Sequence, residues 1–147
     1  MIRETLRSGS IAAVAMMPFG LAFRALGLRI NQYGPAVLEV VFGPLPAAPR
    51  LALMPLEHFL IAWTVAVPLL LMLRRLRDRR TAVVLGAGYG VAFYMAVNSL
   101  ALPWLFGDLT PWQLGVATVV PSLSVHLVYG ISIALTACGW ARPIHSG

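Results

Sequence analysis

Four stretches of this chain are long and apolar enough to cross a lipid bilayer, and they constrain its fold more than any other feature. They cover about residues 10–28, 51–73, 81–106 and 112–140, and a transmembrane helix needs about 20 predominantly apolar residues. Of the 147 residues, 59% are hydrophobic and 11% are charged, whereas about 25% of the residues of a soluble protein are charged. The sequence therefore predicts an all-α, polytopic membrane protein in which residues 1–147 form a single four-helix transmembrane domain. A soluble enzyme and a disordered chain are excluded.

The basic residues predict how these helices are oriented. All eleven are arginines, and segment 74–80 alone holds five of them against one aspartate. Because basic residues concentrate in cytoplasmic loops, this segment and both termini are expected on the cytoplasmic side, with anionic lipid headgroups as its partners. Segment 29–50, rich in proline and glycine, is expected to be an extracytoplasmic loop on the outer headgroups, with a re-entrant piece as the alternative. The net charge of +6 thus reflects membrane topology, and no nucleic-acid partner is expected.

A short pattern recurs in the two halves of the chain. A Phe-Gly pair begins at position 42 and again at position 106, an offset of 64. A histidine follows each pair, at His58 and at His126, an offset of 68. The difference of four residues is close to one helical turn of about 3.6 residues. The pattern predicts an internal repeat of two parallel hairpins, with coincidence at a few positions as the alternative.

Four polar side chains are expected at similar depth in the outer half of the membrane: Arg24, Glu57, His58 and Asn98. Ionisable residues at such depth are rare and usually pair or serve a function. An ion pair between Glu57 and Arg24, with hydrogen bonds to His58 and Asn98, would offset the cost of burying both charges. We expect a structural polar clamp here, with a ligand or proton site as the alternative.

His126 is expected near the midplane of the bilayer, on the fourth stretch. Gly86, Gly90, Tyr94 and Asn98 are spaced by four along the third stretch, so they share one helix face, and a GxxxG pair lets another helix approach closely. We expect this face to meet the fourth stretch, with Gly86 and Gly90 as packing residues and Tyr94 beside His126. The alternative for His126 is a structural, neutral imidazole bonded to Tyr94 or Ser122. The candidate ligand or proton-pathway residues are Arg24, Glu57, His58, Tyr94, Asn98 and His126.

The chain carries no motif typical of an enzyme. The dinucleotide fingerprint GxGxxG, the Walker A loop and the HExxH zinc motif are absent from the sequence. No two acidic residues fall close together within the membrane, as paired acid–base catalysis requires. We therefore expect a non-enzymatic protein without a cofactor. A redox protein is the alternative, with haem b held by His58 and His126, or with a metal ion held by both histidines and Glu57.

Three runs of the second half resemble the YagU-like family of small bacterial inner-membrane proteins. Residues 98–103 read NSLALP, residues 106–111 read FGDLTP and residues 126–129 read HLVY, similar to that family's proline, its Gly-Leu-Thr-Pro and its later His-Leu-Val. Asp108 interrupts the second run, and Asn98 stands near where the family tends to carry a histidine. The resemblance implies the bacterial inner membrane and, for His126, a role in acid stress or proton handling. Imidazole titrates near pH ~6.5, which suits such a role.

These features together predict a small integral membrane protein that handles protons or a small solute through a polar interior. The alternative is an accessory or assembly subunit of a larger membrane complex, because the chain is short and carries a helix-packing GxxxG pair. The expected partners are the lipid bilayer and either further copies of the chain or other membrane subunits.

Overall fold

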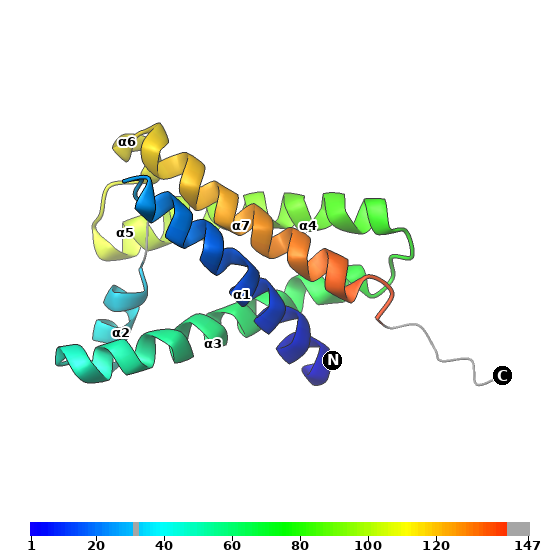
Figure 1. The fold of residues 1–147 in the computed structure, drawn as a ribbon, viewed down its shortest axis with the longest axis horizontal. Coiled ribbons are helices and arrows are strands. Elements are labelled where there is room, and N and C mark those ends of the chain that lie inside the picture. The colour runs from blue at the N-terminus through cyan, green and yellow to red at the C-terminus, as the bar shows by residue number, and fades with distance from the viewer. Residues whose placement is uncertain (31–32, 141–147) are drawn as a thin grey trace.

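The computed structural model describes residues 1–30 and 33–140, and this part of the chain consists of helices and turns without a strand. Four helical stretches are long and apolar enough to span a membrane, so the predicted all-α, four-helix membrane protein is confirmed. They are α1 (Ile2–Ala25), α3 (Ala47–Leu73), the composite of α4 (Arg79–Phe93), η1 (Tyr94–Ala101) and α5 (Leu102–Phe106), and α7 (Val116–Ala137). Two short helices, α2 (Gly34–Phe42) and α6 (Pro111–Leu114), lie between them (Figure 1).

The helix ends differ from those predicted, because local contacts and turns determine them. α1 begins at residue 2 instead of 10, and its polar first turns are held by an ion pair of 2.6 Å between Glu4 and Arg7. α3 begins at residue 47 instead of 51, and α7 covers 116–137 instead of 112–140. Gly115, with φ at +93°, separates α6 from α7, since only glycine adopts this conformation without strain.

Segment 29–50 is not a loop throughout, because it contains the nine-residue helix α2. Its second residue is Pro35, and proline suits the first helical turn because its φ is fixed near the helical value. Tyr33, just before the helix, stacks on Phe106 of α5 with ring centroids 5.6 Å apart. α2 therefore lies between the start of α3 and the end of the third spanning helix (Figure 1).

Both Phe-Gly pairs of the sequence pattern end a helix. Gly43 follows α2 with φ at +73°, and Gly107 follows α5 with φ at +66°. Gly107 is in the left-handed αL region, where glycine commonly ends helices, whereas Gly43 combines its positive φ with a ψ of −171°, a conformation that glycine alone adopts readily. The internal repeat itself stays a prediction.

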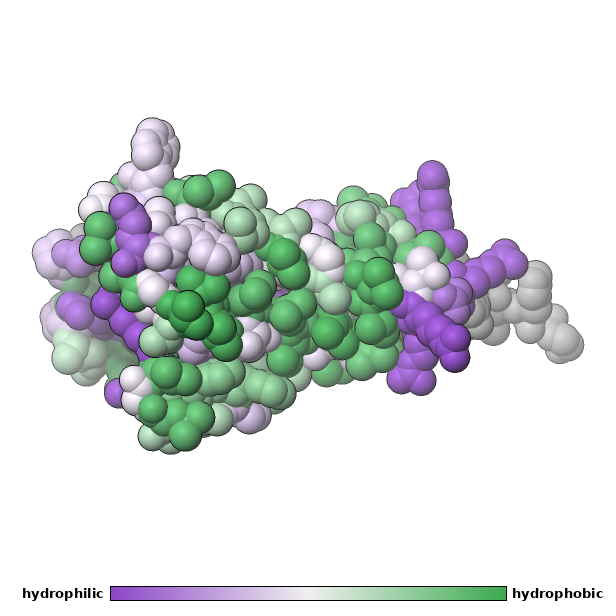
Figure 2. All heavy atoms as spheres, turned by 90° about the horizontal axis from the view of Figure 1, so that it is seen from above, coloured by the Kyte–Doolittle hydropathy of each residue, from purple (hydrophilic) through white to green (hydrophobic). Residues whose placement is uncertain are grey.

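The start of α1, the turn between α3 and α4, and the end of α7 lie at one end of the molecule (Figure 1). Figure 2 shows that this end is hydrophilic, and the arginines of the turn are all exposed there: Arg74, Arg75, Arg77, Arg79 and Arg80. The four spanning helices thus bring the start of α1 and the end of α7 to the same end of the molecule. That this side is cytoplasmic, and that it contacts anionic lipid, remain predictions.

Asp78 begins α4 at the same end. Its carboxylate accepts hydrogen bonds from the backbone N–H and the hydroxyl of Thr81, at 2.7 and 2.6 Å, as helix-capping residues do. These hydrogen bonds to Thr81, the side-chain one above all, lower the pKa of Asp78 below its usual value. The cap is therefore intact at neutral pH and is lost only as the pH falls through that lowered pKa.

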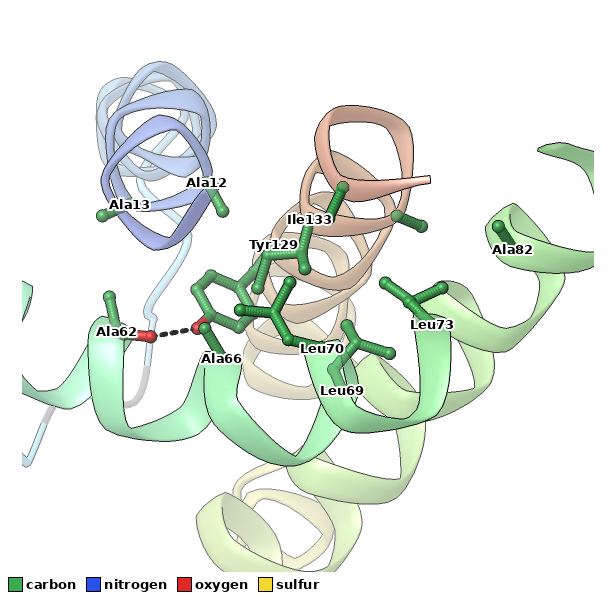
Figure 3. Packing of buried hydrophobic residues seen from close by; sticks show 12 residues of the cluster. Ala12, Ala13, Ala62, Ala66, Leu69, Leu70, Leu73, Ala82, Tyr129 and Ile133 are labelled. Carbon is green, nitrogen blue, oxygen red and sulfur yellow. Dashed lines mark hydrogen bonds between the residues drawn. The ribbon is translucent and has the colours of Figure 1, made fainter. Parts of the chain in front are cut away.

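α7 packs against α1, α3 and α4, and small residues let these helices come close. A Cβ added at Gly86 of α4 would overlap the carbonyl oxygen of Gly130, and one added at Gly90 would overlap that of His126. The predicted packing of the Gly86–Gly90 face on the fourth spanning helix is thus confirmed. Alanines and leucines complete the core, together with Tyr129 (Figure 3); its members are Ala12, Ala13, Ala62, Ala66, Leu69, Leu70, Leu73, Ala82, Tyr129, Ile133, Ala134 and Ala137.

Two tyrosines tie α3 to its neighbours. The Tyr129 hydroxyl of α7 donates a hydrogen bond to the carbonyl oxygen of Ala62 (Figure 3), and the Tyr89 hydroxyl of α4 donates to that of Val65 at 2.7 Å. Both bonds join a side chain to the backbone of another helix. In a membrane no hydrophobic effect drives apolar helices together, so hydrogen bonds of this kind help to determine which helices pack and how.

The substitution Tyr129→Phe is expected to lower the free energy of unfolding by about 1 kcal/mol, because it removes one buried hydrogen bond and keeps the ring. Tyr89→Phe should cost less, because Tyr89 is only half-buried. The measurement is SDS-induced unfolding in mixed micelles, followed by circular dichroism. Wild-type stability for Tyr129→Phe would contradict this role for its hydroxyl.

Candidate functional site

His126 has a defined orientation on α7. Its Nδ1 lies 2.6 Å from the backbone oxygen of Ser122, one turn earlier. A carbonyl oxygen can only accept, so Nδ1 carries the hydrogen, and in the neutral ring Nε2 is then the free acceptor. The imidazole lies against the rings of Phe93 and Tyr94, with centroids 5.7 and 5.5 Å away. The predicted proximity of Tyr94 and His126 is confirmed, and Nε2 is the atom able to take up a proton.

His58 approaches the same place from α3. Its Nε2 lies 3.4 Å from the backbone oxygen of Ala13 on α1, which is long for a hydrogen bond. Its ring meets Phe59 edge-on at 5.9 Å. Since this single contact is weak, the His58 ring is held less firmly than that of His126.

The two histidines line one cavity of about 90 Å³. Side chains from all four spanning helices surround it: Met16, His58, Ile61, Ala62, Val65, Phe93, His126 and Tyr129. A water molecule occupies about 30 Å³ in the liquid, so the cavity has room for a few waters. Two imidazoles from distant parts of the sequence therefore share one small space at membrane depth.

The cavity is small for a haem, and the redox alternative with haem or a metal ion stays a prediction. Its volume of about 90 Å³ falls well below the roughly 300–1,000 Å³ typical of small-molecule and cofactor pockets. In the described part of the chain, no group of three His, Cys, Asp or Glu side chains is arranged to hold a metal ion. Glu57 is next to His58 in the sequence but does not line the cavity.

Glu57 lies instead against the start of α2. A Cβ added at Gly34, the first residue of α2, would come within 2.6 Å of Oε2 of Glu57. A helix N-terminus favours negative charge, because its free N–H groups and its dipole point there. The other carboxylate oxygen, Oε1, is buried without a hydrogen-bonding partner among the described residues.

The expected ion pair between Glu57 and Arg24 does not form. Arg24 is exposed in the last turn of α1. The ion pair found in the described chain joins Arg7 to Glu4 instead. A long arginine side chain near a helix end keeps its guanidinium hydrated at the membrane surface, which removes the need for a buried partner. Arg24 therefore lies outside the candidate site.

Tyr94 lies beside His126 as the sequence predicts, whereas the hydrogen bonds expected from Asn98 to the Glu57, Arg24 and His58 group are not among those formed, and Asn98 Nδ2 has no partner in the described chain. Both residues belong to a π-helix instead of a regular α-helix. η1 covers Tyr94–Ala101 and is followed by Pro103. Proline lacks an N–H and its ring clashes with the carbonyl four residues earlier, here that of Ser99. The wider winding before Pro103 relieves that clash, and π-helical turns occur often at functional sites.

Sequence reasoning missed Ser99 and a cavity between the connecting segments. Ser99 is fully buried in η1, and the signal for it was the proline four positions later. The second cavity, of about 170 Å³, is lined by Arg29, Asp108, Leu109 and Leu114. It lies among the loops at the end opposite the arginine-rich turn, away from both histidines.

Comparison with protein-family models, with curated proteins and with solved structures gives no match for this chain. The arguments for its function therefore rest on the residues and their geometry. The feature with the clearest chemistry is the cavity between His58 and His126.

Proposed function

We propose that this protein is a non-enzymatic integral membrane protein that moves protons through its polar interior, with His126 as the principal proton-binding group. The observation that carries the proposal is the shared cavity, which His58 and His126 both line from different spanning helices. Intramembrane ionisable residues on a bundle interior commonly belong to ion or proton pathways. Histidine is the side chain whose charge changes near physiological pH.

The geometry supports a specific division of roles. His126 Nδ1 stays bonded to Ser122, so the proton is gained and lost at Nε2. Waters in the cavity would carry it between Nε2 and the imidazole of His58, because the space admits a few of them. The weak contact of His58 with Ala13 lets that ring turn and exchange its proton with groups nearer the membrane surface.

The resemblance of the second half to the YagU-like family agrees with this proposal. If the resemblance holds, the protein would belong to the bacterial inner membrane, and the proton pathway would have a use under acid conditions, when protons are driven inward. The arginine-rich turn would then face the cytoplasm and contact anionic lipid headgroups.

The test is proton flux into proteoliposomes that contain a pH-sensitive dye, driven by a potassium diffusion potential. His126→Ala is expected to lower the flux by about tenfold to a hundredfold relative to wild type, as for other positioned proton-transfer groups. Ser124→Ala is the matched control, because the Ser124 hydroxyl bonds only to Val120 of its own helix. Equal flux for wild type and His126→Ala would refute the proposal. Copurification of a stoichiometric partner from mild detergent, with no flux from any variant, would favour the subunit alternative.

A further inference from the structure

Three polar side chains of η1 are buried with an atom that has no hydrogen-bonding partner in the described chain. The atoms are the Tyr94 hydroxyl oxygen, Asn98 Nδ2 and the Ser99 hydroxyl oxygen. The three residues are 0%, 5% and 0% exposed. An unpaired polar group is costly at membrane depth, so three in one turn require an explanation.

The π-helical winding brings these three groups to the same side. In a π-helix the hydrogen bonds join residues five apart instead of four, so the residues four and five positions after Tyr94 lie above it. They are Asn98 and Ser99. In a regular α-helix, Ser99 would be turned well away from Tyr94, because successive residues are about 100° apart.

Tyr94 connects this group to the histidine cavity, because it contacts His126, which lines that cavity. The Tyr94 ring lies 5.5 Å from that of His126 on one side and 6.2 Å from that of Trp112 on the other. Trp112 belongs to α6, which precedes α7 at the end of the molecule opposite the arginine-rich turn (Figure 1). The polar face of η1 therefore lies between His126 and that end.

The chemistry of the three groups selects their ligand. Asn98 Nδ2 has two hydrogens and cannot accept, whereas the two hydroxyls can donate or accept. The ligand must therefore accept from Asn98. A small anion would need a compensating positive charge at this depth, and every arginine in the described chain is exposed.

We propose that the polar face of η1 binds a small cluster of ordered water, held by Tyr94, Asn98 and Ser99. A buried water makes about three hydrogen bonds, and it can accept from Asn98 while donating to a hydroxyl. The location of this cluster deepens the proposed function, on which its role rests: it forms the arm of the proton pathway between His126 and the end that carries α6.

Solid-state NMR in lipid bilayers detects such water without measuring flux. The chain has two asparagines, Asn31 and Asn98, so the variant Asn31→Gln grown with ¹⁵N-asparagine carries Asn98 as its single labelled side-chain amide. Magnetisation is expected to pass from water to this amide as quickly as to exposed backbone amides, despite its burial. Failure of that transfer at long mixing times would overturn the proposal. So would a shift of the amide signal when chloride is replaced by gluconate, because that result identifies an anion.

Thermal stability gives a second, independent measurement. If the Asn98 amide were dry and unpaired, Asn98→Leu would raise Tm, because it removes an unsatisfied donor from apolar surroundings. With bound water, Asn98→Leu is expected to leave Tm unchanged or lower it, since the variant also strips the water of a ligand. A raised Tm contradicts the water cluster. Neither experiment depends on transport. Bound water at Asn98 without proton flux would therefore contradict the proposed function and leave the water cluster standing. Proton flux without bound water at Asn98 would contradict the water cluster and leave the proposed function standing.

Discussion

Replacing Gly86 with alanine is expected to destabilise the protein by about 1–3 kcal/mol, the range found when extra atoms are forced into a tightly packed core. The new methyl group would overlap the Gly130 carbonyl oxygen and would lie 2.7 Å from the Cβ of Ala134. Both obstacles are rigid, because one is backbone and the other is attached directly to it. α4 and α7 must therefore move apart, and this separation also disturbs the contact of His126 with Tyr94.

Gly88→Ala provides the matched control on the same helix. Gly88 is exposed and a Cβ there meets nothing within 4 Å, so the substitution should be neutral or stabilising by about 0.5–1 kcal/mol through lower backbone entropy. Both variants gain the same helix propensity, and their difference isolates the steric clash. The measurement is SDS-induced unfolding at matched lipid content. Equal midpoints for the two variants would show that α4 and α7 do not approach as closely as the structure has them.

Removing both histidines is expected to reduce proton flux no further than removing the more important one. His126→Ala should lower flux by about tenfold to a hundredfold and His58→Ala by about tenfold, because each removes a proton-transfer group. Residues that act as a unit are not additive, and the two imidazoles line one cavity. The double variant should therefore match His126→Ala.

The control for this cycle pairs His126→Ala with Tyr89→Phe. Tyr89 donates to Val65 and does not line the cavity of the two histidines, so its small effect on flux should multiply with that of His126→Ala. Fluxes are normalised to the amount of protein recovered in the liposomes. If the effects of His58→Ala and His126→Ala multiply instead, the two histidines act on separate routes and the shared pathway is wrong.

Several features of the site followed from sequence periodicity alone. The spacing of Gly86, Gly90 and Tyr94 indicated one face of the third spanning helix, and the structure places that face on α7 with Tyr94 beside His126. This prediction succeeded because a helix places residues four apart on one side, and because only small residues allow two backbones to touch.

Other features were not predictable in this way. Similar depth indicated a partnership of Glu57 and Arg24, yet Glu57 lies against the first residue of α2 and Arg24 is exposed. Membrane depth was estimated by counting residues along a helix, and such a count does not give the direction in which a side chain points. The π-helical η1 was missed because its winding depends on Pro103 together with the packing around Tyr94 and Ser99.

The four apolar helices could be predicted from local sequence, because crossing lipid requires long apolar segments with their backbone hydrogen bonds satisfied internally, and both are local properties. The arrangement of the helices in space places His58 and His126 at one cavity without Glu57, and it buries Tyr94, Asn98 and Ser99 with polar atoms that lack partners in the described chain. These outcomes depend on how each helix is rotated and where it crosses its neighbours. Contacts between residues far apart in the chain set those angles, such as Gly86 with Gly130 and Tyr129 with Ala62.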